Sequence, residues 1–409
     1  MRVLLIAPEF HPVSIGGGGV VVKNLAQGLE KKGCSLAVIS ATYHVRGFFD
    51  CPHTTNSGKT EVTWLPLVPS PQVGFQLKSY LPPNMFSVFK LLKVFVKGDF
   101  DVVHLHGFGH VFCDFAGFLS KLSGKPYIHT IHGFPKEPRR RGGLLRCLYG
   151  AYTFFLGNPT VKSAAKIVAV SGSLAEECKI NFPNRTVKVI PNGIDSSCCV
   201  EPSVRKMQEV TAKFGLDGKK VILGLGRLRE GKGFQYAIRA LPYVLEKVQQ
   251  AQLVIAGEDD GFGYTQELSR IVNENGVKNH VSFVGRITDE DEKNALLWQA
   301  SVIVIPSLEE SFGLVALEAM GSGRPIVASR IGGLSEILAK DEYTRLVERG
   351  NVKELADALI ATLTNSDLQV EAKANRGRRL GEFTIDRMAE AYFNLYVSLT
   401  SKSSKAGSG

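Results

Sequence analysis

Short runs of apolar residues alternate with longer segments of helical periodicity along most of the chain. In the first half these runs predict strands at Val3–Ala7, Ser35–Ser40, Thr60–Leu65, Val102–His106, Tyr127–His132, Lys166–Val170 and Val187–Ile190. A second series predicts strands at Val221–Gly226, Gln252–Ala256, Val281–Val284, Val302–Pro306, Ile326–Ala328 and Thr344–Val347. Helices are expected between the strands, for example at Val20–Lys32, Tyr236–Val248 and Val352–Leu363. This alternation is typical of parallel sheets with helices on both faces, so the fold class is predicted to be α/β.

The two series of strands predict two doubly wound, Rossmann-like domains. The length of 409 residues exceeds the roughly 250 to 300 residues at which a single core stops growing. The boundary is expected where SSCCVEPSV interrupts the pattern, which gives an N-terminal domain of residues 1–198 and a C-terminal domain of residues 199–382. The final residues 401–409, SKSSKAGSG, are expected to be disordered.

Composition narrows the class of protein. Hydrophobic residues make up 44% and charged residues 22% of the chain, as in an ordinary globular protein. The opening MRVLLIAPEF is too short and too weakly charged for a signal peptide, and no run of about 20 apolar residues could span a membrane. The seven cysteines are scattered without zinc-ligand spacing, so we expect a cytoplasmic protein without a bound metal.

The net charge of +10 lies entirely in the first half, where residues 1–200 carry 22 Lys and Arg against 11 Asp and Glu. Two stretches there combine basic and apolar residues: Met85–Lys97, with Lys90, Lys93 and Lys97 on one helical side, and Lys136–Asn158. Such stretches suit an anionic membrane surface, although a packing helix with a solvated lysine edge explains them as well. No nucleic-acid reading motif is present, so nucleic acid is not expected as a partner.

The most informative chemical motif is PSLEESFGLVALEAMGSGRPIVAS, which places Glu310 and Glu318 eight residues apart around the start of a helix. Fully helical spacing would separate the two by ~12 Å. Glycosidases need their two carboxyl groups roughly 5 to 9.5 Å apart, so we expect a binding site for two ends of an extended, hydroxyl-rich ligand instead. The alternative is a helix-start charge and a solvated face residue.

Three further candidates follow predicted strands, where doubly wound sheets bind ligands. The glycine run 16–19 lets backbone N–H groups approach a phosphate or a sugar, or it makes a tight turn. Arg227 and Lys232 flank a glycine-containing loop and can converge on one diphosphate, unless this is a basic surface turn. His132 ends a strand and could hydrogen-bond a sugar hydroxyl or move a proton, whereas His104 and His106 on the preceding strand compete for that role or are structural.

Together these segments closely resemble the retaining GT-B glycosyltransferases of family four, whose hallmark is the E-x7-E motif seen at Glu310 and Glu318. GRLREGKGF, IPNGID, the glycine loop, DVVHLHG and GGLSE also stand in the family's order and cover most of the chain. The resemblance implies the GT-B fold, with two Rossmann-like domains that face a central cleft. It also implies a donor site mainly on the C-terminal domain, an acceptor site mainly on the N-terminal domain, and a C-terminal helix at 383–400 that packs back on the first domain.

The resemblance also implies a role for each candidate residue. Arg227 and Lys232 would hold the donor diphosphate, and Glu318 the ribose hydroxyls. Glu310 would contact hydroxyls of the transferred sugar, and His132 would lie over that sugar. The remaining donor-binding residues implied in this way are Gly16, Gly17, Ser311, Phe312, Gly313 and Leu314.

We therefore expect a retaining glycosyltransferase that needs no metal and no cofactor, since two cations can neutralise the leaving diphosphate. A UDP-sugar is favoured as the donor over a GDP-sugar. The acceptor would be a glycolipid, a lipid-linked saccharide or a soluble saccharide, and the enzyme would be cytoplasmic or peripheral on the inner face of the membrane. The alternatives are a sugar-nucleotide epimerase of the same architecture and a non-catalytic module that binds a sugar nucleotide.

Overall fold

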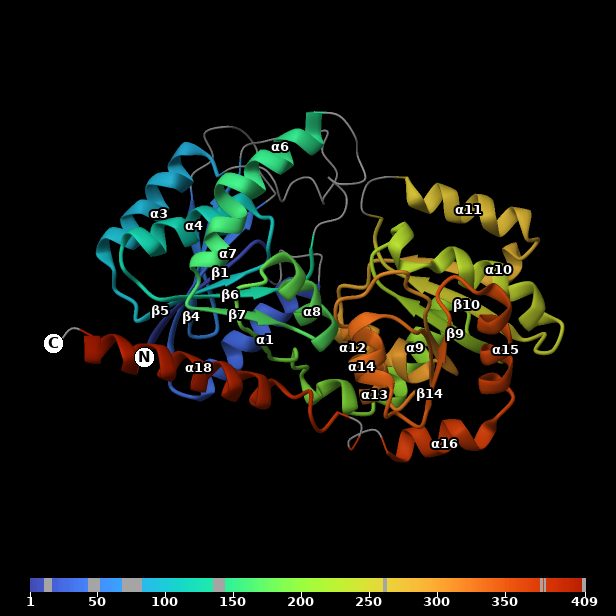
Figure 1. Cartoon of the computed structure of the whole chain (residues 1–409). Helices are drawn as coiled ribbons and strands as arrows, with labels where there is room; N and C mark the ends of the chain where they lie inside the picture. Colours follow the sequence, from blue (N-terminus) through green and yellow to red (C-terminus); the bar gives the residue numbers. More distant parts are fainter. Residues whose placement is uncertain are drawn as a thin grey trace. The chain divides into compact units, whose positions relative to one another are not determined.

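The computed structural model describes residues 1–10, 17–42, 52–67, 83–134, 144–259, 263–375, 378 and 380–406. The chain forms two compact units (Figure 1). Residues Met1–Gly193 and Ile385–Gly409 make the first domain, and Ile194–Thr384 the second, so the division falls slightly before the expected boundary at residue 198. Each domain contains a largely parallel sheet with covering helices, which confirms the predicted α/β class.

The first domain has a sheet of eight strands in the order β3-β4-β2-β1-β5-β6-β7-β8. Its strands are β1 (Arg2–Ala7), β2 (Ser35–Thr42), β3 (His53–Ser57), β4 (Thr60–Pro66), β5 (Val102–His106), β6 (Tyr127–Ile131), β7 (Lys166–Ala169) and β8 (Val187–Val189). All pairs are parallel except β3 with β4, which form a hairpin. The pattern did not predict β3, because its sequence HTTNS is polar and four of its five residues are exposed.

Helices cover both faces of the first sheet. They are α1 (Gly17–Lys31), α3 (Met85–Lys97), α4 (Val111–Leu122), α6 (Leu144–Tyr152), the π-helical turn η1 (Thr153–Gly157), α7 (Asn158–Ser163), α8 (Gly172–Asn181) and α18 (Ile385–Ala406). Val103 and Leu105 of β5 join a core cluster with residues of α3 and α4. The alternate residue His104 faces the other way, toward Tyr396 of α18.

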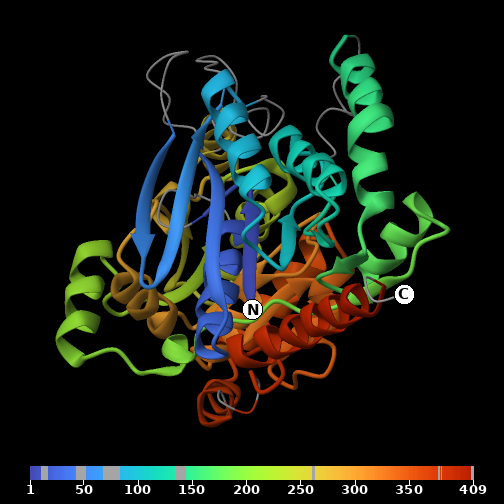
Figure 2. The same cartoon turned by 90° about the vertical axis from the view of Figure 1, so that its left-hand side faces the viewer.

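The C-terminal helix α18 packs on the first domain beside α1 (Figures 1 and 2). A Cβ atom at Gly28 of α1 would lie 2.6 Å from the Cβ of Ala389, so only glycine allows this approach. The helix extends to Ala406, which corrects the expectation that residues 401–406 are disordered. Its last residues contain no Gly or Pro before Gly407, so nothing in that stretch breaks the helix.

The second domain has a parallel sheet of six strands in the order β11-β10-β9-β12-β13-β14. They are β9 (Lys220–Leu225), β10 (Ala251–Ala256), β11 (Val281–Gly285), β12 (Val302–Ile305), β13 (Ile326–Ser329) and β14 (Thr344–Val347). The helices are η2 (Ser196–Cys199), α9 (Val204–Phe214), η3 (Glu230–Lys232), α10 (Phe234–Leu245), α11 (Tyr264–Glu274), η4 (Lys278–His280), α12 (Glu290–Gln299), α13 (Leu314–Gly321), α14 (Gly332–Leu338), α15 (Val352–Leu363) and α16 (Ser366–Ala374).

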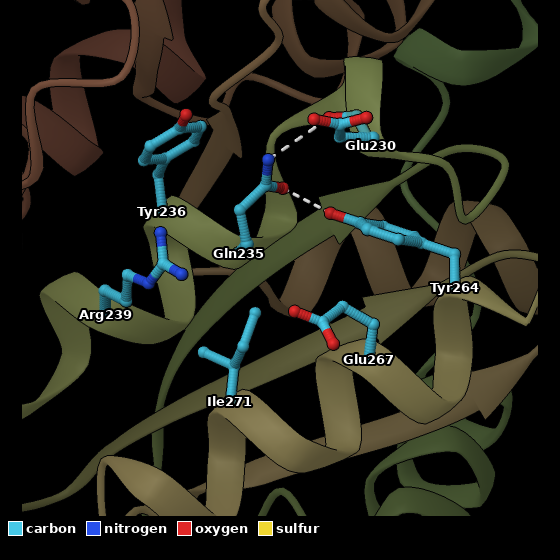
Figure 3. Close-up of a pocket in the computed structure, with 7 residues that line it drawn as sticks. All are labelled: Glu230, Gln235, Tyr236, Arg239, Tyr264, Glu267 and Ile271. Atoms are coloured by element: carbon cyan, nitrogen blue, oxygen red, sulfur yellow. Dashed lines mark hydrogen bonds between the residues drawn. The ribbon is translucent and has the colours of Figure 1, made fainter.

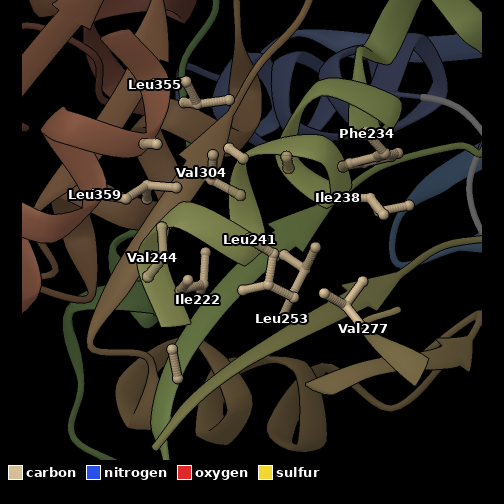
Figure 4. Packing of buried hydrophobic residues seen from close by; sticks show 14 of the residues in the cluster. Ile222, Phe234, Ile238, Leu241, Val244, Leu253, Val277, Val304, Leu355 and Leu359 are labelled. Atoms are coloured by element: carbon tan, nitrogen blue, oxygen red, sulfur yellow. The ribbon is translucent and has the colours of Figure 1, made fainter. Parts of the chain in front are cut away.

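The core of the second domain forms where α10 packs on the sheet (Figure 4). Phe234, Ile238 and Leu241 recur at helical spacing along α10 and are at most 1% exposed. They pack with buried strand residues such as Leu253 of β10. This core fixes α10, and therefore the loop that leads into it, against the carboxyl end of β9.

Candidate functional site

The order of strands in the second sheet places the candidate donor site. From β9 the chain proceeds outward through β10 and β11, and it then returns to β12 on the opposite side of β9. The loops after β9 and β12 therefore leave the same edge of the sheet in opposite directions, which is where doubly wound sheets bind ligands. Residues 226–233 form the first loop and residues 306–313 the second.

Backbone contacts hold the two loops together. The N–H of Leu308 donates a hydrogen bond to the carbonyl oxygen of Gly231 at 2.9 Å. Gly233 has a φ of +72°, and a Cβ atom there would lie 1.8 Å from the carbonyl oxygen of Pro306. Gly333 of α14 makes a similar approach, since its Cβ would lie 2.3 Å from the carbonyl oxygen of Ser311. Gly233 of GKG and Gly333 of GGLSE therefore allow close backbone packing around the candidate site.

This packing brings Lys232 and Glu310 into contact although they are far apart in sequence. Lys232 Nζ lies 2.6 Å from Glu310 Oε2, and each side chain is 18% exposed. The stem of Lys232 passes over Gly226, where a Cβ atom would lie 3.5 Å from Lys232 Cε. The edge of the sheet thus presents a cation and a carboxylate side by side, both accessible to a ligand.

Glu318 is the fifth residue of α13, about one turn in, and has a cationic partner that the sequence did not point out. Lys293 Nζ of α12 lies 3.0 Å from Glu318 Oε1 and 2.7 Å from Glu290 Oε2. Burial alone would lower the pKa of Lys293, but the carboxylates of Glu318 and Glu290 outweigh it and raise that pKa. Lys293 therefore stays charged beside the Glu318 carboxylate. Its only sequence signal is a lysine three residues after Glu290, which is common on helix surfaces.

The other donor-site residues predicted in the second domain lie in the same two loops or at the start of α13. Arg227 is half-buried in the loop after β9. Ser311 is half-buried, whereas Phe312 is buried and its ring lies edge-on to Phe383. Gly313 has a φ of +111° and precedes Leu314, the first residue of α13, so the backbone turns there into the helix.

Of the site residues predicted in the first domain, Gly17 and His132 are described and Gly16 lies outside the described residues. Gly17 is the exposed first residue of α1. His132 directly follows β6 and is half-buried, and its Nε2 lies 3.1 Å from Nδ1 of His106. The basic residues 136–143 also lie outside the described residues.

His104 has the structural role that the sequence left open. Its Nδ1 lies 2.6 Å from Tyr396 Oη of α18, and its Nε2 lies 2.7 Å from Thr130 Oγ1 of β6. Thr130 in turn contacts Tyr392 Oη at 3.0 Å. Both ring nitrogens of His104 are thus occupied inside the domain, so this residue ties α18 to the sheet.

Burial in the first domain lowers the pKa of five histidines. The pKa falls to about 4 for His110, His129 and His132, and burial also holds it well below 6.5 for His104 and His106. In the unfolded chain these histidines take up protons below about pH 6.5. In the folded chain His110, His129 and His132 do so only near pH 4. The contribution of these histidines to the free energy of unfolding should therefore be constant above about pH 6.5 and fall as the pH drops, by on the order of 2 kcal/mol at pH 5 for each of His110, His129 and His132.

Asp114 opposes this trend, because burial raises its pKa to about 8 and its protonation on acidification favours the fold. One carboxyl group does not offset five histidines, so we expect the first domain to melt at least ~10 °C lower at pH 5 than at pH 7.5. Trp64 lies in the first domain and Trp298 in the second, so a Trp298→Phe protein reports the first domain by fluorescence. An equal shift in a Trp64→Phe protein, which reports the second domain, would contradict a local histidine effect.

A separate cavity of about 280 Å³ lies between α10 and α11 (Figure 3). Its lining is Glu230, Gln235, Tyr236, Arg239, Tyr264, Glu267 and Ile271. Gln235 links the carbonyl oxygen of Glu230 to the hydroxyl of Tyr264, so these polar groups satisfy one another. The cavity includes no residue assigned to the donor site and shares only η3 with it.

The described part of the chain contains no helix that is both long and apolar enough to cross a membrane. It also holds no group of three or more His, Cys, Asp or Glu residues arranged to bind a metal ion.

Known families match both halves of the sequence. The family described as Glycosyltransferase Family 4 matches residues 15–197, and the family described as Glycosyl transferases group 1 matches residues 206–379. An uncharacterized glycosyltransferase of Methanocaldococcus jannaschii is 34% identical over 408 residues, which are 97% of this chain and 98% of that protein. A phosphatidyl-myo-inositol mannosyltransferase of Mycobacterium leprae is 27% identical over 341 residues, which are 83% of each protein.

Solved structures share the fold. Sucrose-phosphate synthase from Thermosynechococcus elongatus has a TM-score of 0.75 at 21% identity and covers 98% of this chain and 99% of its own. Anabaena HepE in complex with UDP-glucose has a TM-score of 0.69 at 18% identity, with coverages of 97% and 99%. The chain therefore belongs to the group 1, family 4 glycosyltransferases, and it has the GT-B fold that the sequence predicted.

Proposed function

We propose that this glycosyltransferase moves a sugar from a UDP-sugar to a hydroxyl group of a membrane-associated acceptor, with retention of anomeric configuration and without a metal ion. The contact between Lys232 and Glu310 at the edge of the second sheet carries this proposal. A nucleotide sugar presents a negatively charged phosphate directly beside sugar hydroxyls. A cation next to a carboxylate can bind both groups, because the cation attracts the phosphate and the carboxylate accepts hydrogen bonds from the hydroxyls.

The proposed chemistry uses the residues of the two loops. The bond between C1 of the sugar and the diphosphate breaks, and the diphosphate leaves with the bonding electrons. Lys232 and Arg227 stabilise the negative charge that develops on it, aided by N–H groups at the start of α13. The acceptor oxygen forms a bond to C1 on the same face, and a donor phosphate oxygen takes its proton. Glu310 orients the sugar through its hydroxyls.

The remaining groups hold the substrates. Glu318 accepts hydrogen bonds from the ribose hydroxyls, and its ion pair with Lys293 holds its side chain in place. His132 contacts a hydroxyl of the transferred sugar. UDP is the proposed nucleotide because HepE, which shares the fold, binds UDP-glucose. The mannosyltransferase of M. leprae, named for phosphatidyl-myo-inositol, supports a lipid acceptor.

A screen of donors tests this function. Thermal shifts with UDP-, GDP- and ADP-sugars should single out UDP-sugars, and incubation with lipid extracts should then yield a glycolipid and UDP. The product of an α-linked donor should be an α-glycoside by NMR, and a β-glycoside would overturn retention. Conversion of the donor to its epimer without acceptor would favour an epimerase. Binding with neither reaction would favour a non-catalytic module.

A membrane acceptor is also supported by the exposed face of α3. Ser87, Leu91 and Phe95 turn one side of this helix into the core. The opposite side exposes an apolar stripe of Met85, Phe89, Leu92 and Val96, with Phe89 57% and Val96 86% exposed. A stripe of Lys90, Lys93 and Lys97 runs beside it at helical spacing. Apolar side chains next to lysines suit an anionic bilayer, so we propose that α3 lies on the cytoplasmic surface of such a membrane.

Replacing Lys90, Lys93 and Lys97 together with glutamine should weaken binding to anionic vesicles by ~100-fold, because each lysine near such a surface contributes about 1 kcal/mol. Flotation with vesicles that contain phosphatidylglycerol measures this binding. The matched control replaces Lys247, Lys278 and Lys353, three exposed lysines of the second domain, and removes the same charge. Equal loss in both variants would indicate a general charge effect and remove α3 from the proposal.

A further inference from the structure

His106 and His132 form a hydrogen-bonded pair at the carboxyl edge of the first sheet. His106 ends β5 and is 1% exposed, while His132 follows β6 and is half-buried. His106 Nδ1 lies 3.1 Å from His132 Nε2, and the ring planes are within 18° of each other. The ring centroids lie 5.4 Å apart, close to the largest separation that this N···N distance allows, so the nitrogens meet nearly in the plane of both rings, as a directional N–H···N hydrogen bond requires.

Both rings are neutral near pH 7, because burial lowers the pKa of each. A neutral imidazole carries one N–H, so one ring of the pair donates and the other accepts. If His106 donates from Nδ1, its Nε2 is a bare acceptor and the proton of His132 lies on Nδ1. If His132 donates from Nε2, the proton of His106 lies on Nε2 and Nδ1 of His132 is bare.

The surroundings of His106 Nε2 distinguish these two arrangements. This atom is buried and has no hydrogen-bond partner within the described parts of the chain. The ring of His104 lies against the ring of His106, with centroids 4.0 Å apart. Buried N–H groups without an acceptor are rarer in proteins than acceptors without a donor. The first arrangement is therefore favoured, with Nε2 of His106 unprotonated.

We infer that His106 is a positioning residue that donates a hydrogen bond from Nδ1 to Nε2 of His132 and thereby fixes the proton of His132 on Nδ1. The hydrogen bond made by one ring nitrogen sets the state of the other, so His132 presents an N–H donor and not a bare nitrogen to its ligand. The consequence of this inference rests on the proposed function. In that function the Nδ1–H of His132 donates a hydrogen bond to a substrate oxygen, so His132 does not act there as a base.

NMR of the full chain labelled with ¹⁵N-histidine tests the proton position directly. Long-range ¹H–¹⁵N correlations distinguish the two neutral forms, and the signals of His132 are those lost in a His132→Asn protein. We expect the Nδ1–H form in the wild type. His106→Phe keeps a ring but has no N–H, so His132 should lose that form. His106→Asn places an amide N–H near the position of Nδ1 and should retain it. The Nε2–H form of His132 in the wild type would overturn the inference.

Kinetics with the donor and acceptor found above test the consequence. His106→Phe should lower kcat about tenfold, the effect of one hydrogen bond, with a smaller change in KM for the donor. His106→Asn should stay within about threefold of the wild type. Equal losses in both variants, or unchanged turnover in His106→Phe with an altered His132 signal, would refute a positioning role. The NMR result does not depend on turnover, so it separates failure of this inference from failure of the proposed function.

Discussion

Replacing Lys232 with methionine should lower turnover about 10²- to 10³-fold, the usual effect of removing one group that stabilises a developing anion. Methionine keeps the length of the side chain and removes its charge. Glu310, the partner that remains, is 18% exposed and can be solvated, so the melting temperature should change by only a few degrees. Initial rates at saturating UDP-sugar and a thermal melt of the same preparation measure both quantities.

The control for this variant is a second lysine and glutamate pair of the same domain. Lys213 Nζ of α9 lies 2.7 Å from Glu292 Oε1 of α12, outside the two loops. Lys213→Met removes the same group and should leave turnover within about twofold of the wild type. Normal turnover in Lys232→Met would exclude Lys232 from the site, and with it the proposed neutralisation of the leaving diphosphate.

The sequence predicted most of the fold because apolar strands alternate with amphipathic helices. A buried parallel strand such as Val302–Ile305 excludes charged residues from both faces, so its sequence is an uninterrupted run of apolar residues. The strand β3 lacks that signal, since HTTNS lies at the edge of the sheet and pairs only with β4. Its position depends on the turn at Gly58 and on a neighbour, which local periodicity does not encode.

The sequence also identified the loops of the candidate site, but it did not predict which side chains meet. Glycines and charges after the strands marked Lys232 and Glu310, yet their contact spans 78 residues and depends on β9 and β12 being neighbours. Lys293 could not be identified, because its role follows from the packing of α12 beside α13. The pairing of His106 with His132 likewise requires the register of β5 against β6.

Replacing Gly233 with alanine should destabilise the second domain by about 3 kcal/mol or more. Its φ of +72° is strained for any L-residue with a Cβ atom, at a cost of about 1 to 3 kcal/mol. The added Cβ would also lie 1.8 Å from the carbonyl oxygen of Pro306, and neither backbone segment can rotate away as a side chain could. The loops after β9 and β12 must then separate. Trp298 fluorescence in a Trp64→Phe background should show a melting temperature lower by ~10 °C.

Gly231→Ala is the matched control in the same loop. It introduces the same methyl group two residues earlier, where no atom lies within 4 Å of the new Cβ. This variant should melt within about 2 °C of the wild type, because it neither strains the backbone nor meets a neighbour. If both variants melt alike, close approach of the loops is not what the glycine at 233 provides. If Gly233→Ala alone loses stability and also binds the donor poorly, the contact between Gly233 and Pro306 is what brings Lys232 to Glu310.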